Sequence, residues 1–232
     1  MRINIIAGNI YHVLNRGVDK RAIFLDDGDR LRFIHDLFEF NNIEPLSNLG
    51  YSFKNNNSIV IARRYIDRKP RKLLVEILAF VLMPNHYHLM LRPLFDDGVA
   101  RFMKKLNMGY ARYFNEKYQR SGALFQGRYK SIAINDEAHF IHLPYYIHLN
   151  PLDLITPEWR ERELKDYKKA IEFLNSYRWS SHLDYLGKKN FPSLTSREFL
   201  LQFFDGSKEY QKSVERWLKS IDLENIKDIA LE

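Results

Sequence analysis

The alternation of apolar and polar residues predicts four strands in this chain. Val75 to Met83 is a nearly continuous apolar run, which is typical of a buried strand. Pro84 and Asn85 then turn the chain, so that another strand follows directly. Together with an alternating run near the N-terminus and a run flanked by glycines, the pattern predicts strands at 10–16, 75–83, 86–92 and about 124–134.

Apolar residues at a spacing of three and four predict helices between and after these strands. Acidic residues stand before the first three of them, where they are suitable N-caps. The third helix must end near Leu149, because Pro151 disfavours helical geometry in the residue before it. The predicted helices lie at about 26–38, 96–114, 136–149 and 158–174, and two short helices follow.

This order of elements predicts an α+β fold, with an open and mainly antiparallel sheet flanked by helices. Residues 43–72 are rich in asparagine and then in basic residues, and their periodicity is weak. We interpret them as an insertion that holds one short strand at 58–62. We therefore expect a main domain over residues 1–155 and a helical C-terminal extension over residues 156–232.

The composition excludes several classes of site and location. The 232 residues include no cysteine, so the chain has no disulfide, no cysteine-ligated zinc or iron–sulfur site and no thiol nucleophile. No apolar run approaches the roughly 20 residues that span a bilayer, and the apolar stretch at the N-terminus is too short for a signal peptide. We therefore expect a soluble, cytoplasmic protein without a membrane partner.

The positive charge is concentrated in one part of the sequence. The formal net charge is +7, and residues 101–130 carry eight basic side chains against one acid. Tyrosine and phenylalanine are interleaved with these bases, a mixture that suits a polyanion with stackable bases, although a solvated face has the same composition. The candidate DNA-binding residues are Lys104, Lys105 and Arg112 on the long helix, and Arg128 and Lys130 on the fourth strand.

His86 and His88 form the first constellation that could carry chemistry. Residues at i and i+2 of a strand share a face, so the two imidazoles project side by side about 6–7 Å apart at Cα. This spacing allows both to chelate one divalent ion. The intervening Tyr87 and the following Leu89 are expected to face the core, which places the histidines on the opposite, accessible face. Two exposed strand histidines without a ligand are the plainer alternative.

Tyr146 is the centre of the second constellation. His142, Tyr146 and Asn150 are four residues apart, so we expect them to form one stripe on the helix over 136–149. A tyrosine hydroxyl beside a metal-bound phosphate can act as a nucleophile, and an asparagine carbonyl one turn later can be a neutral metal ligand. The alternative is a half-buried structural tyrosine. Tyr110, Tyr113 and Tyr118 are rival nucleophiles, but their spacing favours packing or base stacking.

Five motifs in the same order resemble the HUH single-tyrosine transposases, and most of all the branch associated with repetitive extragenic palindromes (REP). The segment around His86 resembles the His-hydrophobic-His signature of that family, and the segment around Tyr146 resembles its nucleophile helix. The likeness covers roughly residues 9–187, with gaps. The motifs are YHVLNRG (11–17), MPNHYHLML (83–91), YARYFN and GALFQGRYK (110–115 and 122–130), YIHLNP (146–151) and YRWSS (177–181).

The resemblance implies a fold, a site and an activity. The family fold is a small antiparallel sheet of the ferredoxin-like type flanked by helices, usually in a dimer, so a homodimer is expected. His86 and His88 match the two metal-binding histidines, Tyr146 matches the catalytic tyrosine, and Asn150 stands where the family has a third ligand. The implied cofactor is Mg²⁺ or Mn²⁺, because phosphate and water ligands suit an octahedral ion better than zinc.

The activity implied by the resemblance is breakage and rejoining of single-stranded DNA next to a hairpin, through a 5′-phosphotyrosine intermediate. Such a transposase is expected to act in the cytoplasm, in association with the nucleoid. Two alternatives stay open. One is a catalytically silent nucleic-acid-binding relative, and the other is a metal-dependent phosphodiesterase that uses activated water. Residues 43–72 are longer than the usual link of the family, and the last 40 or so residues match no part of it.

Overall fold

The computed structural model describes residues 6–44, 71–161 and 164–219. The short strand that the sequence predicts at 58–62 lies outside the described residues, as does most of the predicted insertion. Among the described residues, no helix is both long enough and apolar enough to span a membrane.

Four strands form one antiparallel sheet in the order β2-β3-β1-β4. The hairpin of β2 and β3 turns at Pro84 and Asn85, as predicted, and pairs Met83 with His86. The strands span Ile10–Arg16 (β1), Val75–Met83 (β2), His86–Pro93 (β3) and Lys130–Ile134 (β4). The sheet and its helices confirm the predicted α+β class.

The fourth strand is shorter than predicted. It begins at Lys130, and the preceding segment contacts the end of β1 outside a regular ladder. The contacts include an isolated bridge between Gly17 and Phe125 and a bond from the Gln126 amide to the Arg16 carbonyl. The sequence placed the start of this strand at about residue 124, between Gly122 and Gly127. Leu124 and Phe125 are buried, but they pack in the core without a strand partner on a regular ladder.

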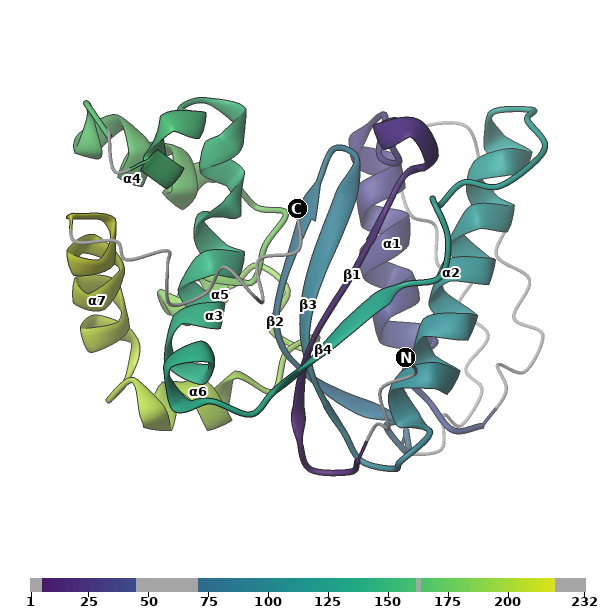
Figure 1. The fold of residues 1–232 in the computed structure, drawn as a ribbon, viewed down its shortest axis with the longest axis horizontal. Helices are drawn as coiled ribbons and strands as arrows, with labels where there is room; N and C mark the ends of the chain where they lie inside the picture. The colour runs from purple at the N-terminus through teal and green to yellow at the C-terminus, as the bar shows by residue number, and fades with distance from the viewer. Residues whose placement is uncertain (1–5, 45–70, 162–163, 220–232) are drawn as a thin grey trace.

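The sheet lies between two layers of helices (Figure 1), and each face has its own hydrophobic core. One face carries Val13 and Leu89 and packs against α1 (Asp27–Glu39) and α2 (Gly98–Lys117). The other face carries Met90 and packs against α3 (Glu137–Leu149). Aspartates cap α1 and α3 as predicted: Asp26 forms a capping box with Asp29, and Asp136 accepts the first amides of α3.

The C-terminal helices complete the core on the α3 side. The predicted continuous helix over 158–174 is wrong, because Asp166 starts a new helix by accepting the amide of Lys169. The observed elements are the short 3₁₀ helices Val18–Lys20 (η1), Asn150–Leu154 (η2) and Pro157–Glu161 (η3), and the α-helices Tyr167–Ser176 (α4), His182–Tyr185 (α5), Arg197–Phe203 (α6) and Ser207–Lys219 (α7).

The segment before α5 attaches this helical part to the edge of the sheet. The Leu82 amide donates to the Trp179 carbonyl at 2.8 Å, and the Ser181 amide donates to the Phe80 carbonyl at 3.0 Å. Ser180 bridges to Val81 between them. The C-terminal part therefore covers the free edge of β2 and shares the core of α3, rather than packing on its own.

Candidate active site

The two histidines of β3 lie under α3, on the face of the sheet opposite α1 and α2. Register places His88 opposite Leu14 of β1 and Val81 of β2, and all three share this face. The sequence prediction that the histidines are accessible is wrong: His86 is 6% exposed and His88 is 0% exposed. The reason is that both faces of the sheet are apolar, so each one is covered by a layer of helices.

Helix α3 brings Tyr146 onto His88 within the same chain. The ring centroids of Tyr146 and His88 are 5.6 Å apart at an interplanar angle of 89°. Asn150 follows one turn later, where its amide bonds to the Tyr146 carbonyl and ends the helix. Tyr146 and Asn150 are both fully buried. The structure therefore joins the two constellations that the sequence predicted separately.

His142 is not part of this group, although the sequence predicts one stripe. Eight residues turn a helix by two full turns and about 80°, so the first and last members of an i, i+4, i+8 series diverge. The Nδ1 of His142 accepts from the Trp217 indole at 2.9 Å, on the side of α7.

His12 is a site residue that the sequence reasoning missed. Its Nε2 lies 2.8 Å from the Nδ1 of His88, and the two rings stack at 5.0 Å. His12 also lies at the edge of the Tyr146 ring, with centroids 6.1 Å apart. Strand alternation places His12 on one face of β1, but only the pairing of β1 with β3 reveals that this is the face of His88.

The donor atoms of the predicted metal ligands suit a divalent cation. His86 Nδ1 donates to the Asn85 side-chain carbonyl at 2.6 Å, which leaves Nε2 with a lone pair in the neutral ring. Burial lowers the pKa of His88 well below its usual value, and the positive charge of neighbouring groups, including Arg160 and Arg16, lowers it further. A neutral imidazole is the form that binds metal.

The third predicted ligand is an amide oxygen. Asn150 Oδ1 is buried, as are the Nε2 atoms of both histidines. Among the described residues, no group of three or more His, Asp or Glu side chains is arranged to hold a metal. Two neutral imidazoles and a neutral amide would leave most of the charge of a bound Mg²⁺ or Mn²⁺ available to an anion. The residues therefore fit the ion that the family resemblance implies.

An arginine from η3 covers the Tyr146 ring. The guanidinium carbon of Arg160 lies 5.3 Å from the ring centroid, within the range of a cation–π contact. Asp153 holds the guanidinium in place through two bonds, at 2.8 Å to Nε and 2.6 Å to Nη2. The side chains of both Arg160 and Asp153 are about a quarter exposed. Tyr146 is thus fixed between a charged group and the histidines.

A known protein family matches this region of the chain. The family model described as "Transposase IS200 like" matches residues 53–150, a span that includes both histidines of β3, Tyr146 and Asn150. The resemblance to these transposases is confirmed. No curated protein sequence matches the chain.

A solved structure shares the fold of this transposase-like chain. It is described as the structure of the REP-associated tyrosine transposase bound to a REP hairpin. The TM-score is 0.51 at 15% sequence identity, and the match covers 83% of this chain and 88% of the other. Because 83% of the chain is more than its first 150 residues, the match includes some residues beyond the range of the family model.

The predicted DNA-binding residues are divided between the two faces of the molecule. Lys104, Lys105 and Arg112 belong to α2, which packs on the face away from Tyr146. Lys130 opens β4 and pairs with Leu14, so it shares the face of His88 and is exposed. Arg128 is exposed in the loop before β4, so the expectation that it alternates with Lys130 on one strand is wrong. DNA contacts by all five remain predictions.

The rival tyrosines are tied into the core of the other face. The Tyr110 hydroxyl donates to the Ile23 carbonyl, and burial raises its pKa far above the usual value. Tyr113 and Tyr118 both donate to the carboxylate of Asp29, and burial raises the pKa of each to about 12. These hydroxyls therefore serve the packing of α2 on α1.

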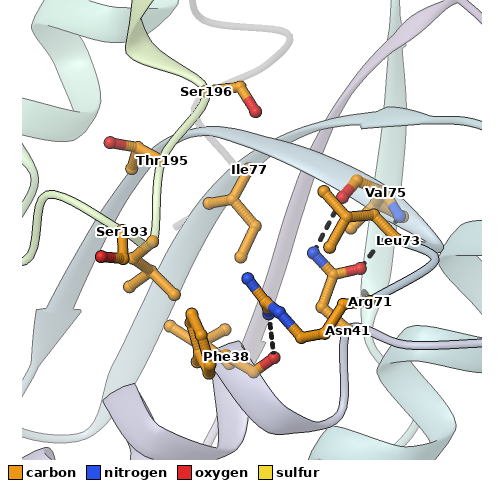
Figure 2. A pocket seen from close by; sticks show the side chains of 11 residues that line it. Phe38, Asn41, Arg71, Leu73, Val75, Ile77, Ser193, Thr195 and Ser196 are labelled. Atoms are coloured by element: carbon orange, nitrogen blue, oxygen red, sulfur yellow. Dashed lines mark hydrogen bonds between the residues drawn. The ribbon is translucent and has the colours of Figure 1, made fainter. Parts of the chain in front are cut away.

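A small pocket lies elsewhere, between the end of α1 and the segment 193–196 (Figure 2). Two of its polar side chains, Asn41 and Arg71, are used internally. Asn41 bonds to the backbone of Leu74 and Val75, and Arg71 donates to the Phe38 carbonyl and stacks on the Phe38 ring. We therefore do not place chemistry in this pocket.

Proposed function

We propose that this protein is a metal-dependent single-stranded DNA endonuclease and strand transferase, a transposase that acts next to DNA hairpins. The observation that carries the proposal is the packing of Tyr146 against His88 in one chain, at 5.6 Å between ring centroids. A tyrosine is a poor nucleophile alone, with a reference pKa of about 10. Its position beside two histidines that suit a metal ion supports a role in attack on phosphorus.

In the proposed reaction, the Tyr146 hydroxyl attacks the scissile phosphate in line. A bond forms between the tyrosine oxygen and phosphorus, the bond to the 3′ oxygen breaks, and the products are a 5′-phosphotyrosine and a free 3′-OH. Attack by a 3′-OH then reverses the step, so neither water nor ATP is consumed. Before DNA binds, Asp153 and Arg160 hold the phenol ring in orientation.

His86, His88 and Asn150 would hold the metal, Mg²⁺ or Mn²⁺. When bound, this ion would neutralise charge on the phosphoryl oxygens and on the departing 3′ oxygen. Asn85 would keep the Nε2 of His86 unprotonated by accepting from Nδ1.

The proposed substrate is single-stranded DNA beside a hairpin. The related solved structure is described as bound to a REP hairpin, which favours this class of partner. An unpaired strand also suits a recessed nucleophile, because its backbone bends into a site that a duplex does not enter. Tyr146 is fully buried, so the proposal requires the cover over its ring, including Arg160, to shift when DNA binds.

The decisive experiment is a test for a covalent complex. The protein is mixed with a labelled, hairpin-bearing single-stranded oligonucleotide and Mn²⁺, and the products are run on a denaturing gel. We expect a protein–DNA band for the wild type that is absent for Tyr146→Phe and in EDTA. Tyr145→Phe is the matched control, since Tyr145 is the neighbouring buried tyrosine and contacts α7 instead of the histidines.

The two alternatives give different results in the same gel. Cleavage that persists in Tyr146→Phe and leaves a free 5′-phosphate would identify a phosphodiesterase that uses water. Binding without cleavage across several hairpins and both metals would identify a silent DNA-binding relative. A covalent band that survives Tyr146→Phe would assign the nucleophile to another tyrosine.

A further inference from the structure

Arg16 is the last residue of β1 and lies directly opposite His86 of β3. Register places it on the face that carries both histidines, since β1 alternates His12, Leu14 and Arg16 toward α3. Cross-strand neighbours of this kind have Cβ atoms about 4.5–5.5 Å apart. The sequence alone predicts no role for this arginine.

The side chain of Arg16 has an unusual environment for a cation. Its Nε is buried and has no hydrogen-bond partner among the described residues. Arg16 also takes part in none of the ion pairs found in the described part of the chain. A buried donor without a partner is costly, so its retention beside a candidate active site indicates a ligand.

The backbone fixes this arginine tightly in position. Its carbonyl accepts the Gln126 amide at 2.8 Å, and its amide donates to the Asn15 side chain at 2.9 Å. A Cβ on the following Gly17 would lie 2.3 Å from the Arg21 carbonyl oxygen, so the chain turns there at a distance that only glycine permits. The guanidinium therefore starts from a rigid anchor beside His86.

Arg160, the other arginine at the site, differs from Arg16 in its hydrogen-bond partners and in its position. Arg160 is already held by two bonds to Asp153 and lies over the Tyr146 ring, so its charge is partly neutralised. Lys130 of β4, which shares the histidine face, is exposed. Of these cations, Arg16 is the one that combines a buried, unused donor with a place next to His86.

We propose that Arg16 binds a non-bridging oxygen of the scissile phosphate of the DNA strand. This inference rests on the proposed function, because it assumes that the phosphate attacked by Tyr146 sits over His86. An arginine fork matches the geometry of a phosphate, and its charge-assisted hydrogen bonds are stronger than those of neutral donors. Arg16 would thus position the phosphate while the metal ligands act beside it.

The test measures the coupling between Arg16 and one phosphate. Binding of the hairpin oligonucleotide is measured in EDTA and in the Tyr146→Phe background, so that neither a bound metal nor cleavage contributes, with a normal phosphate or an uncharged methylphosphonate at the mapped cleavage position. We expect Arg16→Gln to weaken binding of the normal strand by about tenfold and to reduce the salt slope by roughly 0.7. The methylphosphonate should weaken binding to protein that retains Arg16, but should have little further effect on Arg16→Gln.

Two controls separate this result from a general loss of charge or fold. Arg216→Gln removes an exposed arginine on α7 and should leave the methylphosphonate effect unchanged. Arg16→Lys should keep part of the affinity. Equal methylphosphonate effects with and without Arg16, or coupling only to a phosphate several nucleotides away, would overturn the inference.

The outcomes also separate this inference from the proposed function. A wild type that forms the covalent band, combined with absent coupling, overturns the role of Arg16 alone. A wild type that forms no covalent band overturns the proposed function, whatever the binding data. If Arg16→Gln fails to give a cooperative thermal transition, Arg16→Lys supplies the coupling measurement.

Discussion

At the scale of single residues, the site depends on contacts between histidines. His12 and His88 share one hydrogen bond, so one ring must donate while the other accepts. If His88 donates from Nδ1, its Nε2 is left with the lone pair that a metal requires. His12 then orients His88 in the way that carbonyl and carboxylate groups orient other metal-binding histidines.

This arrangement predicts the effect of His12 on metal affinity. We expect His12→Ala to weaken binding of Mn²⁺ to the protein by about 10–100-fold, the usual effect of removing a group that orients a ligand. His12→Gln should lose less, because its amide oxygen accepts the same hydrogen bond. Titration of free Mn²⁺ by electron paramagnetic resonance measures both constants. Equal affinity in His12→Ala and wild type would contradict the role given to His12.

At the scale of elements, α3 is held between the sheet and the C-terminal helices by a buried polar chain. Tyr210 of α7 bonds to His148 of α3 at 2.7 Å and to His182 of α5 at 2.9 Å. The other nitrogen of His148 bonds to the Ser181 hydroxyl at 2.7 Å. His148 is two residues from Tyr146, so this series of hydrogen bonds fixes the helix that carries the proposed nucleophile.

Removal of the Tyr210 hydroxyl, which joins His148 to His182, should destabilise the fold. Tyr210→Phe leaves two buried histidine nitrogens without their partner, which costs about 1–3 kcal/mol in the free energy of unfolding. Tyr167→Phe on α4, where the tyrosine is exposed, should change stability by less than about 0.5 kcal/mol. Urea unfolding followed by circular dichroism compares the two. A loss no larger for Tyr210→Phe than for Tyr167→Phe would show that the chain of bonds is not structural.

The sequence predicted the individual elements of this fold better than it predicted how they begin and which other elements they contact. The strands at 10–16 and 75–83 and the helix that ends at Leu149 are local patterns, and the structure confirms them. The single helix expected over 158–174 failed because apolar and charged periodicity does not show where a side chain such as Asp166 caps a new start.

The same limit applies to the candidate site. His86, His88, Tyr146 and Asn150 were identified from spacing and motif, since each pair lies within one strand or one helix. His12, Arg16 and Arg160 enter the site only through the pairing of β1 with β3 and the docking of η3 on α3, which are long-range contacts. The burial of the histidines was missed for the same reason, because one strand does not reveal what covers its face.

At the scale of the whole molecule, buried histidines make stability depend on pH. Burial lowers the pKa of His182 to about 3, and lowers the pKa of His88 and of His148 well below the usual 6.5. Between the folded and unfolded pKa values, only the unfolded chain binds the proton. Stability is therefore complete above about pH 6.5 and falls as the pH is lowered toward 3.

This linkage gives a measurable loss in mild acid. Each such histidine should cost about 1 kcal/mol in the free energy of unfolding between pH 7.5 and pH 5.5. His182→Gln should remove the contribution of this histidine to the change in the free energy of unfolding between the two pH values, although it also lowers stability at both. Urea unfolding at the two pH values, without added metal, measures the difference. Equal stability at pH 7.5 and 5.5 would mean that these histidines bind their protons in the folded state.

The placement of Tyr146 against His88 in one chain also predicts how copies of the protein cooperate. A homodimer remains a prediction from the family resemblance, and light scattering tests it. In a dimer with exchanged tyrosine helices, a Tyr146→Phe chain mixed with a His86→Ala chain would rebuild one intact site. The structure instead places Tyr146 beside His88 within one chain, with ring centroids 5.6 Å apart and α3 fixed by the C-terminal helices of the same chain. We therefore expect the mixture to form no covalent complex with hairpin DNA, even after co-expression or co-refolding to exchange subunits.

Each variant mixed with wild type should leave the wild-type signal in place, which shows that neither one inhibits the assay. A covalent band from the mixture of the two variants would mean that the tyrosine helix acts on the partner subunit, and that the arrangement seen within one chain is not the active one.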